Sequence, residues 1–156
     1  MISVFDASAL LAIDYYCSTP QNVFGEMIEM VSDGTVCFCN EVLDELHRMA
    51  SAEWPYVWAK SVSERRRHKG GGYSTKVLIA AQVQELIDSE ATYESAAPAV
   101  LAQAYDLRQD GMDAHIVTED TMDKPTRIPL VIACTRLGVP CKSTYEFLKA
   151  YNLLDL

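Results

Sequence analysis

Acidic residues follow three short apolar segments that have the composition of β-strands. The segments are residues 2–5, 35–39 and 115–118, and the acids that follow them are Asp6, Glu41, Glu45, Glu119 and Asp120. Because parallel strands deliver their carboxyl ends to one edge of a sheet, we expect these carboxylates to lie on one rim. Carboxylates brought together in this way repel one another unless a divalent cation lies among them.

Such a rim predicts metal chemistry. Oxygen ligands at a partly open site favour Mg²⁺ or Mn²⁺ over zinc. Ions held there could assist phosphodiester cleavage, because they deprotonate and orient a water and neutralise the leaving oxygen. Thr118, at the end of its strand, would donate a hydrogen bond to a phosphate or to bound water. A simpler interpretation of Asp6 and Ser8 is that they cap the helix that follows them.

Three motifs resemble the PIN-domain ribonuclease family, which includes the VapC-type toxins. Val4–Leu11, reading VFDASALL, looks like the family's first acidic motif. Asn40–Leu46, reading NEVLDEL, is similar to the second, and Ile116–Asp120, reading IVTED, looks like the strand that ends in T-x-D. The tail KPTRIPLVIACTRLGVPC, followed by a helix, resembles a VapC-like branch long described as a domain of unknown function. The resemblance covers nearly the whole chain.

The resemblance implies a metal-dependent endoribonuclease that is the toxin of a bacterial type II toxin–antitoxin pair. If the matching positions have the roles they have in the family, Asp6, Glu45 and Asp120 would hold Mg²⁺ or Mn²⁺, and Glu41 would be the reserve candidate for Glu45. Ser8 and Thr118 would support ligand or water geometry, and Glu119 would be a secondary acid. A metal-bound water would be the nucleophile. RNA as substrate, an antitoxin protein as inhibitor and a second copy in a homodimer are the implied partners.

One position departs from the family pattern. The family places an Asp at the start of the helix before the third strand, and this chain has Ala97 there, in the run Ala96–Ala102. Two interpretations remain open. Either the natural protein has lost the acid and acts as a catalytically silent module that binds RNA or protein, or Ala97 is an inactivating substitution in a toxic nuclease. Losing one ligand carboxylate should lower turnover severely.

A basic segment interrupts an acidic chain. The net charge is −9, yet six of the thirteen basic residues lie between Lys60 and Lys76. Four of them, Arg65, Arg66, Arg67 and Lys69, stand just before three successive glycines, so residues 64–73 are predicted to form a flexible loop. The loop is either simply solvated or an arm that grips RNA phosphates, with Tyr73 or Trp54 available to stack on bases.

The remaining pattern indicates one α/β domain over residues 1–156. Apolar stretches with helical periodicity alternate with the short strands, which predicts a PIN-like three-layer sandwich with a central parallel sheet of four or five strands between helices. No apolar run has the length of a membrane span, and the amino terminus lacks a signal pattern, so we expect a cytoplasmic protein. The five cysteines are predicted to be buried thiols. A flavodoxin-like receiver domain is a further alternative, but no acid pair precedes Asp6.

Overall fold

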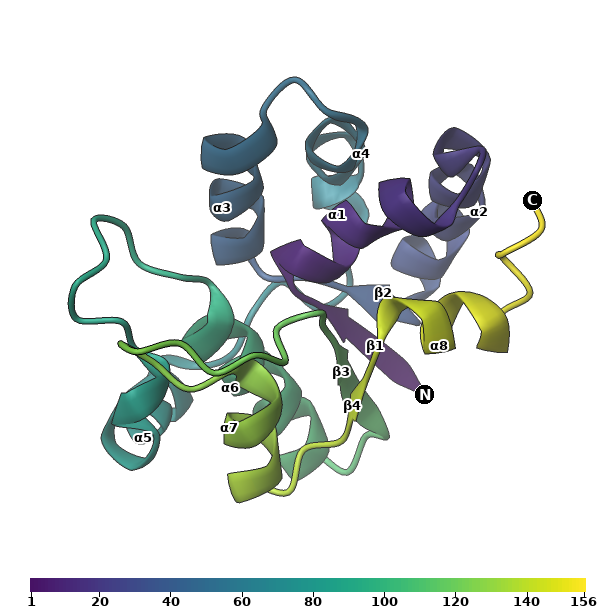
Figure 1. Ribbon diagram of the computed structural model, residues 1–156. Coiled ribbons are helices and arrows are strands. Elements are labelled where there is room, and N and C mark those ends of the chain that lie inside the picture. Colours follow the sequence, from purple (N-terminus) through teal and green to yellow (C-terminus); the bar gives the residue numbers. More distant parts are fainter.

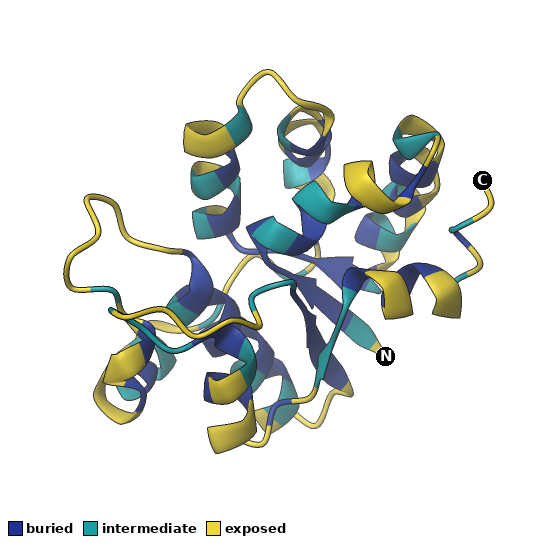
Figure 2. Ribbon diagram, viewed as in Figure 1, coloured by how far each residue is buried: buried dark blue, intermediate teal, exposed yellow.

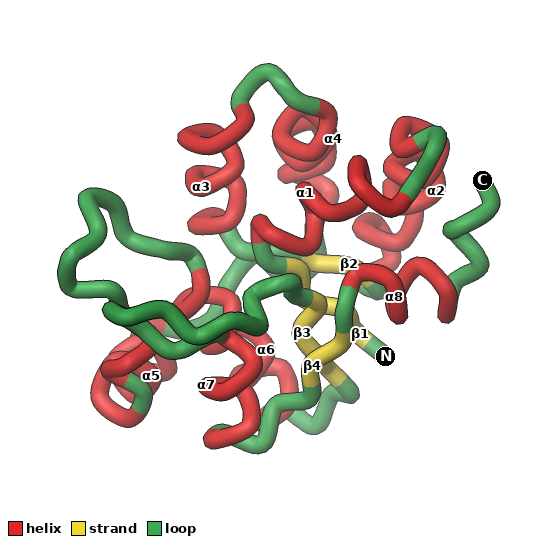
Figure 3. Tube along the Cα trace, in the orientation of Figure 1, coloured by secondary structure: helices red, strands yellow, loops and turns green.

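A central parallel sheet organises the protein in the computed structural model, which describes residues 1–156. Its strands are β1 (Ile2–Phe5), β2 (Val36–Cys37), β3 (Ala114–Val117) and β4 (Cys141–Lys142), in the order β2-β1-β3-β4. Every neighbouring pair is parallel. Figure 3 shows the four strands in yellow at the centre of the tube. The predicted α/β fold with a parallel sheet of four or five strands is therefore confirmed.

Eight α-helices surround the sheet. They are α1 (Ala7–Tyr16), α2 (Pro20–Asp33), α3 (Asn40–Ala50), α4 (Trp54–Val62), α5 (Tyr73–Gln82), α6 (Ala97–Gln109), α7 (Leu130–Arg136) and α8 (Thr144–Ala150), with short 3₁₀ turns at Ser63–Arg65 and Gln84–Leu86. In Figure 1, α1 to α4 lie on one side of the sheet and α5 to α7 on the other, which gives three layers. None of the helices is both long and apolar enough to cross a membrane.

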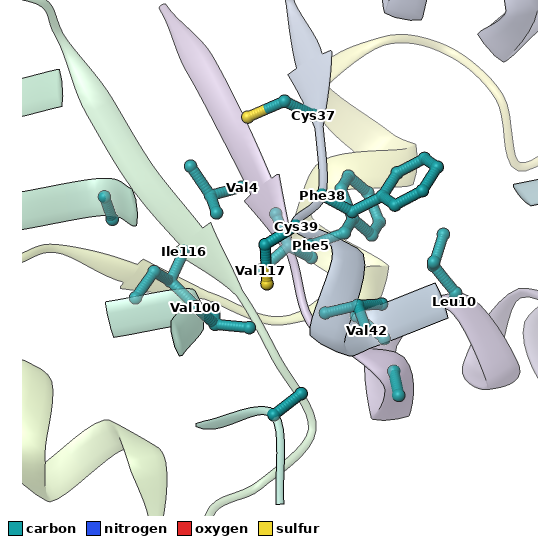
Figure 4. Packing of buried hydrophobic residues seen from close by; sticks show 14 of the residues in the cluster. Val4, Phe5, Leu10, Cys37, Phe38, Cys39, Val42, Val100, Ile116 and Val117 are labelled. Atoms are coloured by element: carbon teal, nitrogen blue, oxygen red, sulfur yellow. The ribbon is translucent and has the colours of Figure 1, made fainter. Parts of the chain in front are cut away.

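The register of the strands sets which side chains face each layer. Val4 pairs with Cys37 on one side and with Ile116 on the other, and Phe5 pairs with Val117. Figure 4 shows Val100 of α6 beside Ile116, and Phe5 lying on the side of the sheet that carries Leu10. The Phe5 ring also meets the ring of Phe147 in α8 edge to face, with their centroids 4.8 Å apart.

Both faces of this sheet are covered, as a parallel sheet requires. All four residues of β3 are buried, and burial in Figure 2 concentrates on the strands and the inward sides of the helices, while helix ends and loops are exposed. Gly34 and Gly138 follow α2 and α7 with positive φ, and Ser143 and Glu146 form a reciprocal capping box on α8. All five cysteines are free, and only Cys141 is partly exposed.

The helix boundaries differ from expectation at two places. Asn40 stands just before an apolar periodic run, a position that predicts a helix cap, but it is the first residue of α3, and its side-chain oxygen accepts a hydrogen bond from Arg66 instead. Apolar residues with helical periodicity predict a helix over residues 77–88, whereas α5 begins earlier, at Tyr73, and ends at Gln82. Its early start has a tertiary cause, because the Asp106 carboxylate accepts hydrogen bonds from the Gly72 N–H and the Thr75 hydroxyl in the first turn of α5.

The glycine-containing segment that precedes α5 is packed against the body of the protein and does not extend freely into solvent. The side-chain amide of Gln103 in α6 donates to the His68 carbonyl at 3.1 Å. A Cβ on Gly71 would come within 2.8 Å of the backbone of Ala102. Gly71 is therefore required for a close approach between the segment and α6, and the glycines are not explained by mobility alone.

Candidate functional site

A cleft lies at the carboxyl edge of the sheet, where the predicted rim of acids was expected. Its volume is about 360 Å³. Four carboxylates line it, together with two basic side chains and several small or apolar residues; its lining is Asp6, Ser8, Glu45, Met49, Ser95, Ala96, Ala97, Glu119, Asp120, Thr121, Met122, Lys124 and Arg127. We call this the acidic cleft. Its acids come from the end of β1, from α3 and from the connector that follows β3.

Asp6 is the most constrained of the four acids. It is the N-cap of α1, and its Oδ1 accepts hydrogen bonds from the Ala9 N–H at 2.8 Å and the Ser8 hydroxyl at 2.7 Å. The hydroxyl of buried Thr118 donates to Oδ2. The capping interpretation of Asp6 is therefore correct, whereas Ser8 is inside the helix. The same carboxylate also lines the acidic cleft, so capping and a place in the candidate site coexist.

Burial governs the electrostatics of Asp6. Desolvation is the largest influence and raises the pKa of the carboxyl from 3.8 to about 6, with the nearby Asp120 adding to the rise. The hydrogen bonds from Thr118, Ala9 and Ser8 act in the opposite direction. The free energy of the ionised carboxylate is thus raised by its surroundings, and a cation beside it would relieve that cost.

Ser8 and Thr118 connect β1 to the connector after β3. The Ser8 hydroxyl oxygen accepts a hydrogen bond from the Glu119 N–H at 3.0 Å, and the Thr118 hydroxyl oxygen accepts one from the Asp120 N–H at 2.9 Å. Each hydroxyl therefore donates a hydrogen bond to the Asp6 carboxylate and accepts one from the backbone N–H of a second acid. The family resemblance implies that both hydroxyls support ligand or water geometry, and in the structure both are hydrogen-bonded to Asp6 at the edge of the cleft.

Asp120 is neutralised by the chain itself. Its Oδ2 accepts hydrogen bonds from Arg127 at 2.8 Å and from the Leu130 N–H, at the start of α7, at 3.1 Å. Both partners of the ion pair are largely buried, with side chains 12% and 13% exposed. Arg127 and Lys124 were not among the candidates from the sequence. Their only signal was their place in the polar connector that the KPTR motif begins.

The glutamates differ in their attachments. Glu45 Oε2 accepts a hydrogen bond from the Ala96 N–H at 2.6 Å, so it holds the first turn of α6 beside the acidic cleft. Glu119 accepts one from the Thr144 N–H at the start of α8, at 3.3 Å. Glu41 does not line the cleft, and its carboxylate pairs with Lys76 of α5 at 2.9 Å, which lowers its pKa despite partial desolvation. The structure thus favours Glu45 over Glu41 as the site residue.

Ala97 is the first residue of α6 and lines the acidic cleft. An aspartate at this position would therefore add a carboxylate to the cleft. In the present arrangement no three His, Cys, Asp or Glu side chains form a group that could hold a metal ion. The carboxylates are bound by donors of the protein instead, namely hydroxyls, backbone N–H groups and Arg127.

The basic segment lies away from the acidic cleft, since none of its residues is in the cleft lining. The prediction that Arg66 contacts RNA is wrong, because this residue is buried. Its guanidinium donates hydrogen bonds to the carbonyls of Ser63 and Phe38 and to the side-chain oxygen of Asn40. Its charge also lies over the Phe38 ring, 4.7 Å from the centroid. Lys69 pairs with Glu64, and Arg65 and Arg67 remain exposed.

The comparison with family models gives one match, and it covers nearly the entire chain. Residues 4–153 match the model described as a domain of unknown function, DUF4411. The chain belongs to the DUF4411 family. No curated protein and no solved structure matched in the corresponding searches. The family description carries no activity, so functional inference depends on the acidic cleft.

Proposed function

We propose that the protein is a metal-dependent endoribonuclease and the toxin of a type II toxin–antitoxin pair. The observation that carries this proposal is the convergence of Asp6, Glu45, Glu119 and Asp120 on one cleft at the carboxyl ends of parallel strands. The resemblance of the three acidic motifs to the PIN family supports RNA as the substrate. We place the protein in the cytoplasm, with an antitoxin protein and a second copy of the chain as further partners.

The oxygen donors of the acidic cleft suit a hard divalent cation such as Mg²⁺ or Mn²⁺. No three of these carboxylates lie close enough together to hold an ion as they stand, so Asp6, Glu45 and Asp120 would hold it only after their side chains move toward one another. Such an ion supplies an activated water and stabilises charge on the phosphate. The chain's own part is positional: the Ser8 and Thr118 hydroxyls fix the Asp6 carboxylate and the backbone of Glu119 and Asp120.

The deciding experiment introduces, at the position of Ala97, the acid that the PIN-family pattern has there. RNA cleavage in Mn²⁺ is compared for the chain as given, for Ala97→Asp, and for Ala97→Asp combined with Asp6→Ala. We expect the Ala97→Asp protein to cleave RNA faster by about 100-fold or more, since one group that stabilises charge in the transition state contributes factors of this size. Adding Asp6→Ala should remove this gain.

Binding of the ion is measured on the same proteins by calorimetry. Ala97→Asp should bind Mn²⁺ more tightly than the parent. If Ala97→Asp binds Mn²⁺ more tightly but cuts no RNA, the nuclease proposal fails and only the metal site stands. If Ala97→Asp shows neither Mn²⁺ binding nor RNA cleavage, the metal site and the nuclease proposal both fail.

A catalytically silent binding module is the second candidate. The observation that favours it is Ala97 itself, together with the ion pair by which Arg127 already neutralises Asp120. This candidate predicts RNA or protein binding that is independent of Mn²⁺ and unaffected by Ala97→Asp. A source gene that encodes Ala at position 97 would support it, and one that encodes Asp would count against it.

A further inference from the structure

A second hollow opens directly beside the acidic cleft. Its volume is about 450 Å³, and it shares five lining residues with the cleft, namely Glu45, Met49, Ser95, Lys124 and Arg127. Its other lining residues are Arg48 at the carboxyl end of α3 and the residues Asp88, Ala91, Thr92, Tyr93 and Glu94 of the loop between α5 and α6. We call it the side groove. In Figure 1 that loop projects from the same side of the molecule as the connector after β3.

One wall of the side groove carries positive charge next to the acids. Residues 124 and 127 close a tight turn through reciprocal backbone hydrogen bonds of 3.2 and 3.4 Å. Arg127 of this turn forms an ion pair with Asp120. Lys124, by contrast, is exposed, and its ammonium has no acidic partner within 4 Å. Lys124 is therefore a free cation at the boundary between the acidic cleft and the side groove.

Another part of the lining presents an aromatic ring with a cation above it. The Arg48 guanidinium lies 5.0 Å from the centroid of the Tyr93 ring and donates to the Glu94 carbonyl at 2.9 Å. Tyr93 is nevertheless 66% exposed. Burying so much aromatic surface is favourable, and an exposed ring held in place by an arginine offers a preorganised face for stacking. Exposed Met49 adds apolar surface between this ring and the cleft.

We propose that the side groove binds the single-stranded segment of RNA that flanks the phosphate in the acidic cleft. Lys124 contacts a backbone phosphate, and a base stacks on Tyr93 beside Arg48. This inference rests on the proposed function, because it takes the acidic cleft as the place where the phosphodiester is cut. It assigns substrate binding to residues remote from the basic segment around Arg65.

Single-stranded RNA fits these features better than a duplex. Bases in a duplex are paired and stacked on one another, so their faces are not accessible to Tyr93. An unpaired base can turn its face to an aromatic side chain, and such stacking contributes about 1–3 kcal/mol per base in nucleic-acid complexes. A free lysine beside it suits the phosphate that follows. The continuity of the two hollows gives the strand a path into the cleft.

The test pairs variants of the side groove with matched variants of the basic segment. Lys124→Ala is compared with Arg65→Ala, and Tyr93→Ala with Tyr73→Ala; all four side chains are exposed. Binding of a short fluorescein-labelled single-stranded RNA is measured by anisotropy in Ca²⁺ at several salt concentrations, and the same RNA annealed to its complement is the duplex probe. Thermal melting of each variant establishes that it is folded.

We expect Lys124→Ala and Tyr93→Ala each to weaken single-strand binding by about fivefold or more, and Lys124→Ala also to reduce the salt slope by about 1. Arg65→Ala and Tyr73→Ala should leave binding unchanged, and the duplex should bind more weakly. Losses confined to Arg65→Ala and Tyr73→Ala would overturn the proposal in favour of an RNA-binding arm. Absence of measurable RNA binding, or duplex binding as tight as single-strand binding, would also overturn it.

The failure of this inference is distinguishable from failure of the nuclease proposal. If Ala97→Asp cleaves RNA while Lys124→Ala and Tyr93→Ala alter neither RNA binding nor cleavage, the proposal that the side groove binds RNA is wrong and the nuclease proposal holds. If both substitutions weaken RNA binding but Ala97→Asp never cleaves, the side groove stands as part of a binding module. Binding of an acidic peptide at Lys124 with no RNA binding would replace the RNA assignment by a protein partner.

Discussion

Asp6 shows at the scale of one residue how a single side chain can serve both the fold and the candidate site. Its Oδ1 completes the first turn of α1, and both oxygens accept hydrogen bonds from hydroxyls that also position the connector after β3. Because the group is buried without a cationic partner, the ionised form is disfavoured. This cost makes the stability of the protein depend on pH.

Substituting Asp6 by Asn tests that cost. The folded-state pKa of about 6 lies above the ordinary 3.8, so the contribution of Asp6 to stability is full below about pH 4 and is lost as pH rises through 6. Asn keeps the capping oxygen and does not titrate. We expect the free energy of unfolding of Asp6→Asn, relative to the parent, to rise by up to about 3 kcal/mol from about pH 3 to about pH 7.

Urea denaturation at the two ends of this range measures the difference. His115, whose pKa burial lowers to about 4, titrates in both proteins, so its influence cancels in the comparison. A difference that does not change with pH would mean that the Asp6 carboxyl titrates normally in the folded protein.

Arg66 and Arg65 are adjacent in the sequence but have unlike surroundings. Arg66→Ala would leave the Phe38 carbonyl and the Asn40 side-chain oxygen without their donor and remove the cation above the Phe38 ring. We expect a loss of about 2–4 kcal/mol in the free energy of unfolding, because buried acceptors of a charged donor become unsatisfied. Arg65→Ala is the matched control and should change it by less than about 0.5 kcal/mol. Equal effects in denaturant melts would contradict the buried role of Arg66.

At the scale of elements, the segment between the 3₁₀ turn at Ser63–Arg65 and α5 links two layers of the fold. Hydrogen bonds of Arg66 connect it to the end of β2 and the start of α3, and hydrogen bonds to Gln103 and Asp106 connect it to α6. These contacts are all distant in sequence. The three glycines therefore belong to a packed connection, and one of them is tested by adding a single methyl group.

Gly71→Ala should destabilise the protein by about 1–3 kcal/mol, because the new Cβ would overlap the Ala102 backbone, which cannot move independently of α6. Gly70→Ala is the control, since its Cβ would make an ordinary contact of 3.9 Å with Cys39. Thermal melts of the two variants measure the difference. Equal midpoints would show that the segment does not approach α6 as closely as described.

Local signals in the sequence predicted most of the elements. A Ser with a Glu three positions later, as at Ser143 and Glu146, is typical of a capping box, and a glycine just after an apolar periodic run, as at Gly34, is typical of a helix end; the structure has both. The early start of α5 was not predicted, because it depends on Asp106, which lies more than thirty residues beyond the α5 N-terminus. Helix ends that are capped by distant side chains carry no local signal.

The candidate site was predictable to a similar extent. The placement of Asp6 and Asp120 follows from strand ends in a parallel sheet, a rule of topology. The family resemblance ranked Glu45 above Glu41, but helical periodicity alone could not separate them, since both lie on α3 and their tertiary partners Ala96 and Lys76 distinguish them. Nor could the sequence show that Arg127 neutralises Asp120 or that Arg66 is buried. Each depends on which surfaces meet when the layers pack.

At the scale of the whole molecule, the distribution of charge is more informative than its sum. Four of the thirteen basic residues are paired with acids, at Glu41, Glu64, Glu85 and Asp120, and Arg66 is buried. Because the chain as a whole has a net charge of −9, attraction for a polyanion must be local. This is why the position of Lys124 beside the acidic cleft carries weight.

The order of the strands has a consequence for synthesis on the ribosome. The first strand made, β1, is central in the sheet, and its partner β3 follows after about a hundred further residues; Phe5 pairs with Val117. Pairings this distant in sequence form late, when most of the chain is available. The acidic cleft needs residues up to Arg127 and therefore cannot exist on an early nascent chain. A growing polypeptide is thus without its candidate site until the chain has been translated as far as Arg127.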